Sequence, residues 1–154
     1  MIVPDLSIKH FLYDQCLVYI DKCINHAQKA LQDALQSGND ETKSSAGDKH
    51  ETARSLLQLE QEKNTKQLND LLLQKDRLLK IDASRISQSI SMGSIVITSS
   101  GNFYIAIAAG KLELQGETYF AISPMSPIGL KLKGLKADDT LMFNNKEYQI
   151  RYVL

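Results

Sequence analysis

The sequence has no tryptophan, only three prolines and two cysteines, and no net charge, because 18 basic side chains balance 18 acidic ones. This balance argues against a nucleic-acid-binding protein that relies on bulk positive charge. No apolar run approaches the roughly 20 residues that a membrane span needs, and the N-terminal residues lead into no signal segment. With a hydrophobic fraction of 43%, these absences predict a soluble, cytoplasmic protein with a packed core and no membrane contact.

Residues that commonly carry chemistry are equally sparse. Cys16 and Cys23 lie in a segment of helical periodicity, so the helix rise separates their α-carbons by about 10.5 Å, beyond disulfide reach. His10, His26 and His50 are too scattered for a zinc signature. No glycine elbow surrounds a serine, and no glycine-rich phosphate loop is present. The sequence therefore predicts structural cysteines and no self-contained catalytic centre.

The first half of the chain has the pattern of a coiled coil. Small or apolar residues recur there with steps of mostly four and three, which is typical of a helical seam. The seam residues of the first helix, expected over about residues 6–36, are Leu12, Cys16, Ile20, Cys23, Ala27, Ala30 and Ala34.

Turn and capping residues over 37–46 predict a break after this helix. A second helix is expected from about residue 48 to the early 80s, and its seam residues are Ala53, Leu57, Leu68, Leu71 and Leu78, with polar Asn64 and Lys75 at other seam positions. Isolated helices of this polarity are marginal in water, so an antiparallel hairpin of the two is expected.

After a serine-rich join the period changes from helical to two. Strands are expected at 95–98, 103–108, 111–115 and 118–122, a short helix at 126–133, and a final hairpin turning at Asn144 and Asn145. The predicted fold class is α+β: a helical hairpin over 1–84, a linker over 85–92, and a small antiparallel β domain with one short helix over 93–154.

The expected tip of the hairpin is acidic. Asp48 and Glu51 are three residues apart, so in the first turn of a helix they share a face and could jointly hold a hard divalent cation. The same spacing also forms a capping box, so the two carboxylates have a purely structural alternative. Two carboxylates alone hold Mg²⁺ weakly, and a functional site would need ligands from a partner. Asp40 and Glu41 in the preceding segment could assist them.

Two motifs carry a resemblance to a known family. The hairpin tip with Gly47, Asp48, Glu51 and Ala53 resembles that of the GreA/GreB family of bacterial transcription elongation factors, whose tip typically reads Gly-Asp-Leu-Lys-Glu-Asn-Ala. The positions that depart from this pattern are Lys49, His50 and Thr52. The second match, similar to a segment of the family's FKBP-like domain, comprises Ser126, Pro127, Ile128, Gly134, Asp138 and Asp139.

The resemblance implies a protein that inserts its hairpin into the secondary channel of RNA polymerase. Asp48 and Glu51 would then help to hold a Mg²⁺ ion shared with the polymerase, which cleaves backtracked RNA. Ser126, Pro127 and Ile128 would contact the channel rim, although a proline after serine is also a simple helix-start signal. The chain itself would be no enzyme, would act as a monomer, and would reach RNA and DNA only through the polymerase.

Other functions stay open at this stage. The same fold could regulate the polymerase without promoting cleavage, or could be a coiled-coil interaction protein with an FKBP-like adaptor and no link to polymerase. Prolyl isomerase activity is disfavoured because tryptophan is absent and fold alone does not carry the pocket. Basic residues interleave with glutamates along the hairpin, which predicts a solvated face rather than a nucleic-acid track; they are Lys43, Lys49, Arg54, Lys63 and Lys66.

Overall fold

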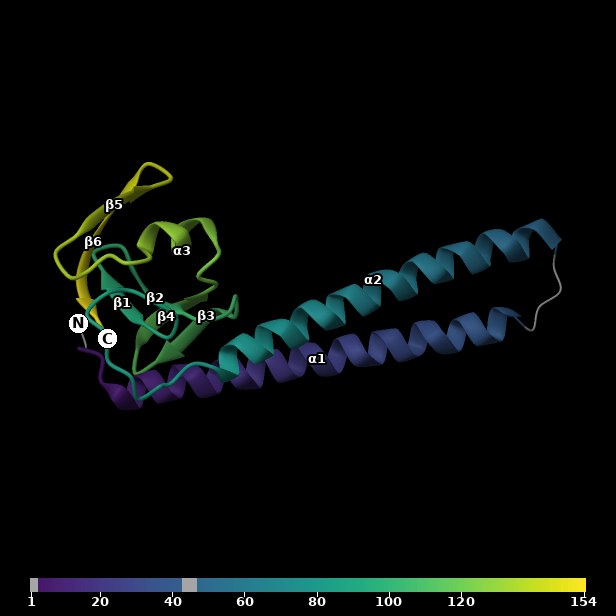
Figure 1. Ribbon diagram of the computed structural model, residues 1–154, viewed down its shortest axis with the longest axis horizontal. Coiled ribbons are helices and arrows are strands. Elements are labelled where there is room, and N and C mark those ends of the chain that lie inside the picture. The colour runs from purple at the N-terminus through teal and green to yellow at the C-terminus, as the bar shows by residue number, and fades with distance from the viewer. Residues whose placement is uncertain (1–2, 43–46) are drawn as a thin grey trace. The chain divides into compact units, whose positions relative to one another are not determined.

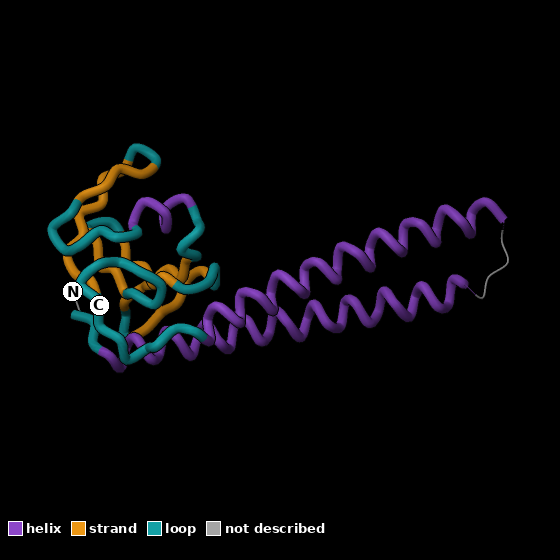
Figure 2. The backbone as a smooth tube through the Cα atoms, viewed as in Figure 1, coloured by secondary structure: helices purple, strands orange, loops and turns teal. Residues whose placement is uncertain are grey.

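The computed structural model describes the backbone of residues 3–42 and 47–154 and the side chains of 3–38 and 51–154. Its elements are α1 (Leu6–Thr42), α2 (Gly47–Leu79), β1 (Ile95–Thr98), β2 (Gly101–Ile105), β3 (Gly110–Leu114), β4 (Glu117–Ile122), α3 (Pro127–Leu132), β5 (Thr140–Phe143) and β6 (Lys146–Val153) (Figure 1). A long helical region thus precedes a six-stranded sheet with one short helix (Figure 2). The predicted α+β fold class is confirmed.

The chain forms two compact units that do not follow its order. One comprises Met1–Tyr19 and Arg77–Leu154 and is called the sheet unit; the other comprises Ile20–Asp76 and is called the helix-pair unit. The sheet unit therefore takes in the first turns of α1 and the end of α2. The linker expected over residues 85–92, between a helical domain and a β domain, stays a prediction.

Within the helix-pair unit, α1 and α2 run antiparallel. The Gln61 side-chain nitrogen donates to the carbonyl of Ala34 at 3.3 Å, and Lys75 Nζ lies 2.6 Å from Asp21 Oδ1. The earlier residue of α1 therefore contacts the later residue of α2, and the later residue of α1 contacts the earlier residue of α2, as in an antiparallel pair. The α2 residues turned inward at this seam are Ala53, Leu57, Gln61, Asn64, Leu68 and Leu71.

The predicted end of the first helix at about residue 36 is wrong, because α1 continues to Thr42. Serine, glycine and asparagine lower helix propensity by at most about 1 kcal/mol each, and tertiary pairing routinely overrides that preference. The hydrogen bond between Gln61 of α2 and Ala34 of α1 lies close to the predicted end of the first helix and helps to stabilise α1 in this region.

The seam of α1 also differs from the predicted one. Cys23 is only half-buried and Ala30 is exposed, whereas Ile24 is buried and Leu31 half-buried. The buried positions advance in steps of four from Ile8 to Ile24. Each step of four residues rotates the buried stripe by about 40° around a helix of 3.6 residues per turn. The buried stripe of α1 therefore differs from the predicted seam, in which steps of four and three residues alternate.

The sheet has the strand order β3-β4-β2-β1-β6-β5. Four neighbouring pairs are antiparallel, as predicted, whereas β2 and β4 are parallel, a pairing that the sequence analysis did not predict. After β2 the chain forms β3 at the edge of the sheet, two positions away from β2. The next strand, β4, then fills the position between β2 and β3. That return uses a tight turn in which Gln115 (φ 53°) and Gly116 (φ 79°) both have positive φ, as hairpin turns of this kind require.

One cluster of the core of the sheet unit lies between the sheet and α3. Its buried members are Ile90, Val96, Phe103, Ile105, Leu132 and Ile150. Along β6, Tyr148, Ile150 and Tyr152 are turned inward while the residues between them are exposed, as the period-two pattern predicts. Asn144 (φ 50°) and Asn145 (φ 61°) form the predicted turn before β6.

Candidate functional site

The predicted acidic tip coincides with the start of α2. This helix begins at Gly47, so the backbones of Asp48 and Glu51 both lie in its first turn. Glu51 is exposed. The side chain of Asp48, like those of Asp40 and Glu41, lies outside the described residues, so the geometry of the carboxylate pair stays a prediction.

The rotation of α2 about its axis explains why Glu51 is exposed. Ala53 and Leu57 are half-buried on the seam with α1, and Glu51, Thr52 and Arg54 are exposed. Successive residues are turned by about 100° around a helix, so Glu51 is about 200° away from Ala53. A carboxylate at this position points away from the partner helix and is accessible to an outside ligand.

No cluster of three or more histidine, cysteine, aspartate or glutamate side chains is present in the part of the chain with described side chains. Cys16 and Cys23 are both free thiols. Cys16 is buried in the core, and its burial raises the pKa of the thiol to about 12. A thiol held in its protonated form is a poor nucleophile and a poor metal ligand, which supports a packing role for Cys16.

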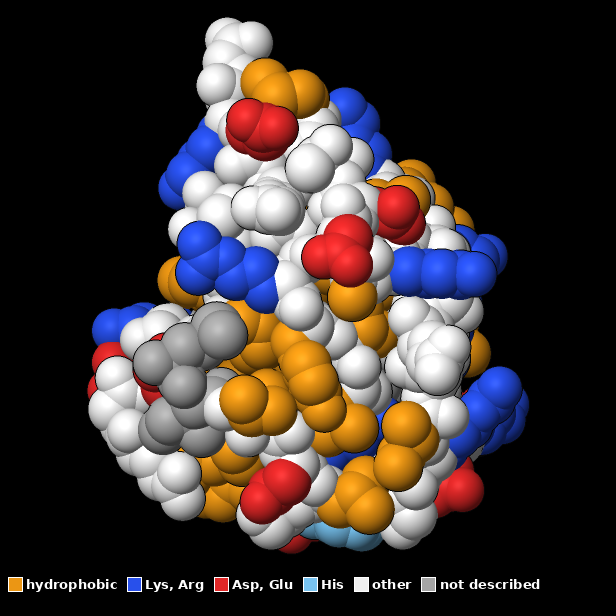
Figure 3. Space-filling model, turned by 90° about the vertical axis from the view of Figure 1, so that its left-hand side faces the viewer, with side chains coloured by type: hydrophobic (Ala, Val, Ile, Leu, Met, Phe, Trp, Pro, Cys, Tyr) orange, Lys and Arg blue, Asp and Glu red, His pale blue; other side chains and the backbone are white. Residues whose placement is uncertain are grey.

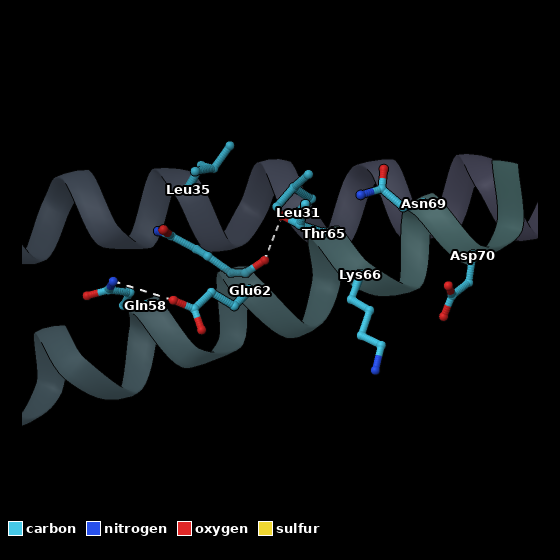
Figure 4. A pocket seen from close by; sticks show the side chains of 9 residues that line it. Leu31, Leu35, Gln58, Glu62, Thr65, Lys66, Asn69 and Asp70 are labelled. Carbon is cyan, nitrogen blue, oxygen red and sulfur yellow. Dashed lines mark hydrogen bonds between the residues drawn. The ribbon is translucent and has the colours of Figure 1, made fainter. Parts of the chain in front are cut away.

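The helix-pair unit also carries an open groove of about 590 Å³. Leu31 and Leu35 of α1 form one wall, and polar side chains of α2 form the rest (Figure 4). Along α2, Lys66 lies one turn from both Glu62 and Asp70. The charges in this groove therefore alternate in sign, and they form no continuous basic track for a nucleic-acid backbone.

The second predicted motif starts helix α3. Ser126 is its N-cap: the hydroxyl oxygen accepts from the Gly129 amide at 3.1 Å and the hydroxyl donates to the Ser123 carbonyl at 2.7 Å. Pro127 is exposed, and Ile128 packs against the core. The hydroxyl of Ser126 is thus engaged within the sheet unit, and Pro127 is the member of the motif that faces solvent. Their contact with a polymerase rim stays a prediction.

Several apolar side chains that no sequence motif marked are exposed in and near α3. Met125 is 67% exposed, Leu130 53% and Met142 57%. Lys131 Nζ of α3 donates to the Met142 carbonyl of β5 at 3.0 Å, which ties the two elements together. We call the side chains of Met125, Pro127 and Leu130 the α3 surface; Met142 lies on the face of β5 opposite to Leu141, which packs against the core. The available signal was the apolar residues that flank the Ser-Pro-Ile motif.

The acidic pair after α3 has a structural role. Asp139 Oδ2 accepts from the Lys136 amide at 2.7 Å. Its carbonyl accepts from the Ile150 amide at 2.8 Å, and the Asp138 amide donates to the Ile150 carbonyl at 2.8 Å. This turn therefore fastens the segment after α3 to β6.

Hydrophobic side chains also gather in the middle of the side of the molecule shown in Figure 3, and charged side chains of both signs stand around them. Exposed apolar residues in the sheet unit include Val3 at 59% and Ile86 at 64%.

In the part of the chain that the structure describes, no helix is both long enough and apolar enough to cross a membrane.

No protein-family model matches the sequence, and no curated protein matches it. Among solved structures, that of the transcription factor Gfh1 is similar over 87% of this chain and 90% of that chain, with 17% sequence identity and a TM-score of 0.34.

Proposed function

We propose that this protein is a transcription elongation factor that inserts its helix pair into the secondary channel of RNA polymerase and stimulates cleavage of backtracked RNA. One observation carries the proposal: α2 starts at Gly47 and exposes Glu51 in its first turn. The motif Gly-Asp-x-x-Glu-x-Ala, which resembles the GreA/GreB tip, therefore coincides with the start of the second helix of an antiparallel pair.

The dimensions of the helix-pair unit suit this role. From Ile20 to Thr42, α1 spans about 33 Å at 1.5 Å per residue. Two packed helices have axes only about 8 to 10 Å apart. Such a narrow pair can enter a channel that excludes a globular domain, and it presents the first turn of α2 at its end.

The donor chemistry at the tip fits a magnesium ion. Carboxylate oxygens are ligands that Mg²⁺ prefers, and it commonly combines one or two of them with ligands from elsewhere. When bound, the ion would lower the pKa of water and stabilise the charge that develops during phosphodiester cleavage. In this proposal Asp48 and Glu51 supply two of its ligands, the polymerase supplies the others, and the polymerase is the enzyme.

The α3 surface is the proposed contact with the polymerase rim. Its exposed apolar side chains, with Pro127 among them, resemble the apolar centre of a protein interface. Ser126 supports this surface indirectly, because its capping bonds hold the start of α3 in place. Disrupting α3 would therefore weaken binding even where the exposed side chains are unchanged.

The test uses bacterial RNA polymerase stalled in a backtracked complex with end-labelled RNA. Addition of the protein and Mg²⁺ should shorten the RNA, and Glu51→Gln should reduce this cleavage at least about tenfold. Glu60→Gln, an exposed glutamate on the same helix, serves as the matched control and should act like the unchanged protein. If the protein binds the complex and yields no shortened RNA, the cleavage proposal is wrong.

A second candidate is a channel-binding regulator that does not stimulate cleavage. The observation that favours it is the sequence between the two carboxylates, where Lys49 and His50 replace the family's leucine and lysine. The lysine thus directly follows Asp48 in the sequence instead of directly preceding Glu51, and a positive charge close to the tip weakens its attraction for a metal cation. This candidate predicts slower nucleotide addition by the polymerase without shortened RNA.

A further inference from the structure

A basic pocket of about 280 Å³ lies within the sheet unit, formed by the start of α1, the end of α2 and the segment that follows. The charged residues that line it are the cations Lys9, Arg77, Lys80 and Arg85 and the carboxylate of Asp82. Four basic residues and one acidic residue thus line a small volume. These residues belong to none of the motifs found in the sequence.

Lys9 is the innermost of these cations. Its side chain is only 3% exposed, and its Nζ donates to the carbonyl of Arg85 at 2.5 Å. Burial lowers the pKa of the Lys9 ammonium, and the charge of Asp82 partly opposes that effect. Because a buried ammonium has three donors and is costly without charge compensation, an anion in the pocket would stabilise its charged form.

Helix termini explain only part of this charge. Arg77 lies in the last turn of α2 and Lys80 directly follows the helix, where cations interact favourably with the helix dipole. Lys9 and Arg85 come from other elements, so the dipole of α2 does not account for their presence. Among residues 3–38 and 51–154, the structure describes no ion pair for the guanidinium groups of Arg77 and Arg85. Their donors are therefore available to a bound anion.

A neutral donor adds to the cations. Ser94, which also lines the pocket, is 1% exposed. Its hydroxyl oxygen accepts from the Ser91 amide at 3.1 Å, which leaves the hydroxyl hydrogen to donate. The residues that line this pocket carry guanidinium, ammonium and hydroxyl donors, which are the groups that bind phosphoryl oxygens.

We propose that this pocket binds a small phosphorylated anion, with inorganic diphosphate as the simplest ligand. Its volume lies just below the range of about 300 to 1,000 Å³ that holds drug-sized ligands, which suits one or two phosphoryl groups rather than a whole nucleotide. The excess of positive groups favours a multiply charged anion over a singly charged one. The site is independent of the tip of the helix pair.

The test is isothermal titration calorimetry of the full chain with sodium diphosphate, and with sodium chloride at equal ionic strength. Diphosphate should bind with one site per chain and chloride should not. Arg85→Gln removes one guanidinium but retains the backbone carbonyl that Lys9 binds, and should weaken binding at least about tenfold, or 1.4 kcal/mol. Arg151→Gln makes the same charge change at an exposed position of β6 and should leave the affinity unchanged.

Three results would overturn the proposal. The first is the absence of binding at about 1 mM diphosphate, a concentration that fills roughly nine-tenths of a site with a Kd of about 0.1 mM. The second is an equal loss of affinity in both arginine variants, which would indicate a general charge effect. The third is binding of a single-stranded RNA oligomer, weakened by Arg85→Gln, that diphosphate does not displace. Lys9→Met should also abolish binding, and if it fails to fold, Arg85→Gln decides.

Discussion

Gly38 of α1 faces Gln61 of α2 so closely that a β-carbon at position 38 would lie 2.7 Å from the Gln61 side-chain nitrogen. The same nitrogen donates to the carbonyl of Ala34, one turn earlier on α1. A glycine that looks like a helix breaker in the sequence therefore leaves room for a polar contact between the two helices.

This relationship predicts a coupled effect on stability. Gly38→Ala should gain about 1 kcal/mol of helix propensity but displace the Gln61 amide and lose a bond of similar value, so the net change should be close to zero. In a Gln61→Ala background the full gain of about 1 kcal/mol should appear. Urea unfolding followed by circular dichroism measures both values.

The matched control for this cycle is Gln58→Ala, which removes an exposed amide of α2. Gly38→Ala should have the same effect in that background as in the unchanged protein. A gain of about 1 kcal/mol from Gly38→Ala in all three backgrounds would show that the close approach has no energetic consequence.

The start of α3 gives a second prediction. A β-carbon at Gly129 would lie 2.3 Å from the backbone oxygen of Ser123, so Gly129→Ala forces the backbone to move. We expect it to cost about 2 to 3 kcal/mol, against about 1 kcal/mol for loss of the cap in Ser126→Ala. Leu130→Ala, at an exposed position, should stay within about 0.5 kcal/mol. Equal unfolding free energies for Gly129→Ala and Ser126→Ala would contradict this order.

Much of the sheet unit could be predicted because its signals are local. Alternation of Tyr148, Ile150 and Tyr152 sets the inward face of β6, and adjacent asparagines mark the turn before it. The parallel pairing of β2 with β4 has no local signal, because it depends on where the chain lies after it leaves β2. The same applies to the C-terminal end of α1, where pairing with α2 outweighs local propensity.

The candidate sites also differ in whether a local sequence signal marks their residues. The position of Glu51 follows from a helix start that the sequence marks with capping residues. Gly129 and Lys9 gave no such signal. The need for glycine at 129 arises from the Ser123 carbonyl, and Lys9 is buried where the carbonyl of Arg85, 76 residues away, reaches its ammonium.

The two thiols should differ in reactivity. Cys16 is fully buried and Cys23 is half-buried, and burial raises the pKa of the Cys16 thiol to about 12. A disulfide reagent at neutral pH should therefore modify one thiol in the native protein and the second only after unfolding. Cys23→Ser should remove the fast reaction, whereas fast modification of Cys16 in that variant would contradict its burial.

The raised pKa of Cys16 also predicts a pH dependence. Its pKa moves from 9.0 to about 12 on folding, so above the lower value the unfolded chain has lost a proton that the folded chain retains. Stability should fall as pH rises from about 9 towards 12. Between about pH 8 and pH 10 the unchanged protein should lose about 1.4 kcal/mol more than Cys16→Ala. Parallel loss in both proteins, measured by urea unfolding at each pH, would contradict the assignment.

The tip carboxylates allow a metal ligand to be separated from a helix cap. Asparagine caps a helix about as well as aspartate, and glutamine serves in a capping box as glutamate does, but neither amide replaces the charge that Mg²⁺ requires. Asp48→Asn and Glu51→Gln should therefore change the unfolding free energy by less than about 0.5 kcal/mol. Each should nevertheless reduce cleavage of backtracked RNA at least about tenfold, the equivalent of one lost charge-assisted contact.

The alanine variants complete this comparison. Asp48→Ala and Glu51→Ala should lose cleavage to the same extent as the amide variants and also lose about 0.5 to 2 kcal/mol of stability, the range for a missing cap. Glu60→Ala should change neither quantity, because that side chain is exposed on α2 beyond the first turn. If the amide variants retain full cleavage activity while the alanine variants lose stability and activity together, the two carboxylates act only as caps.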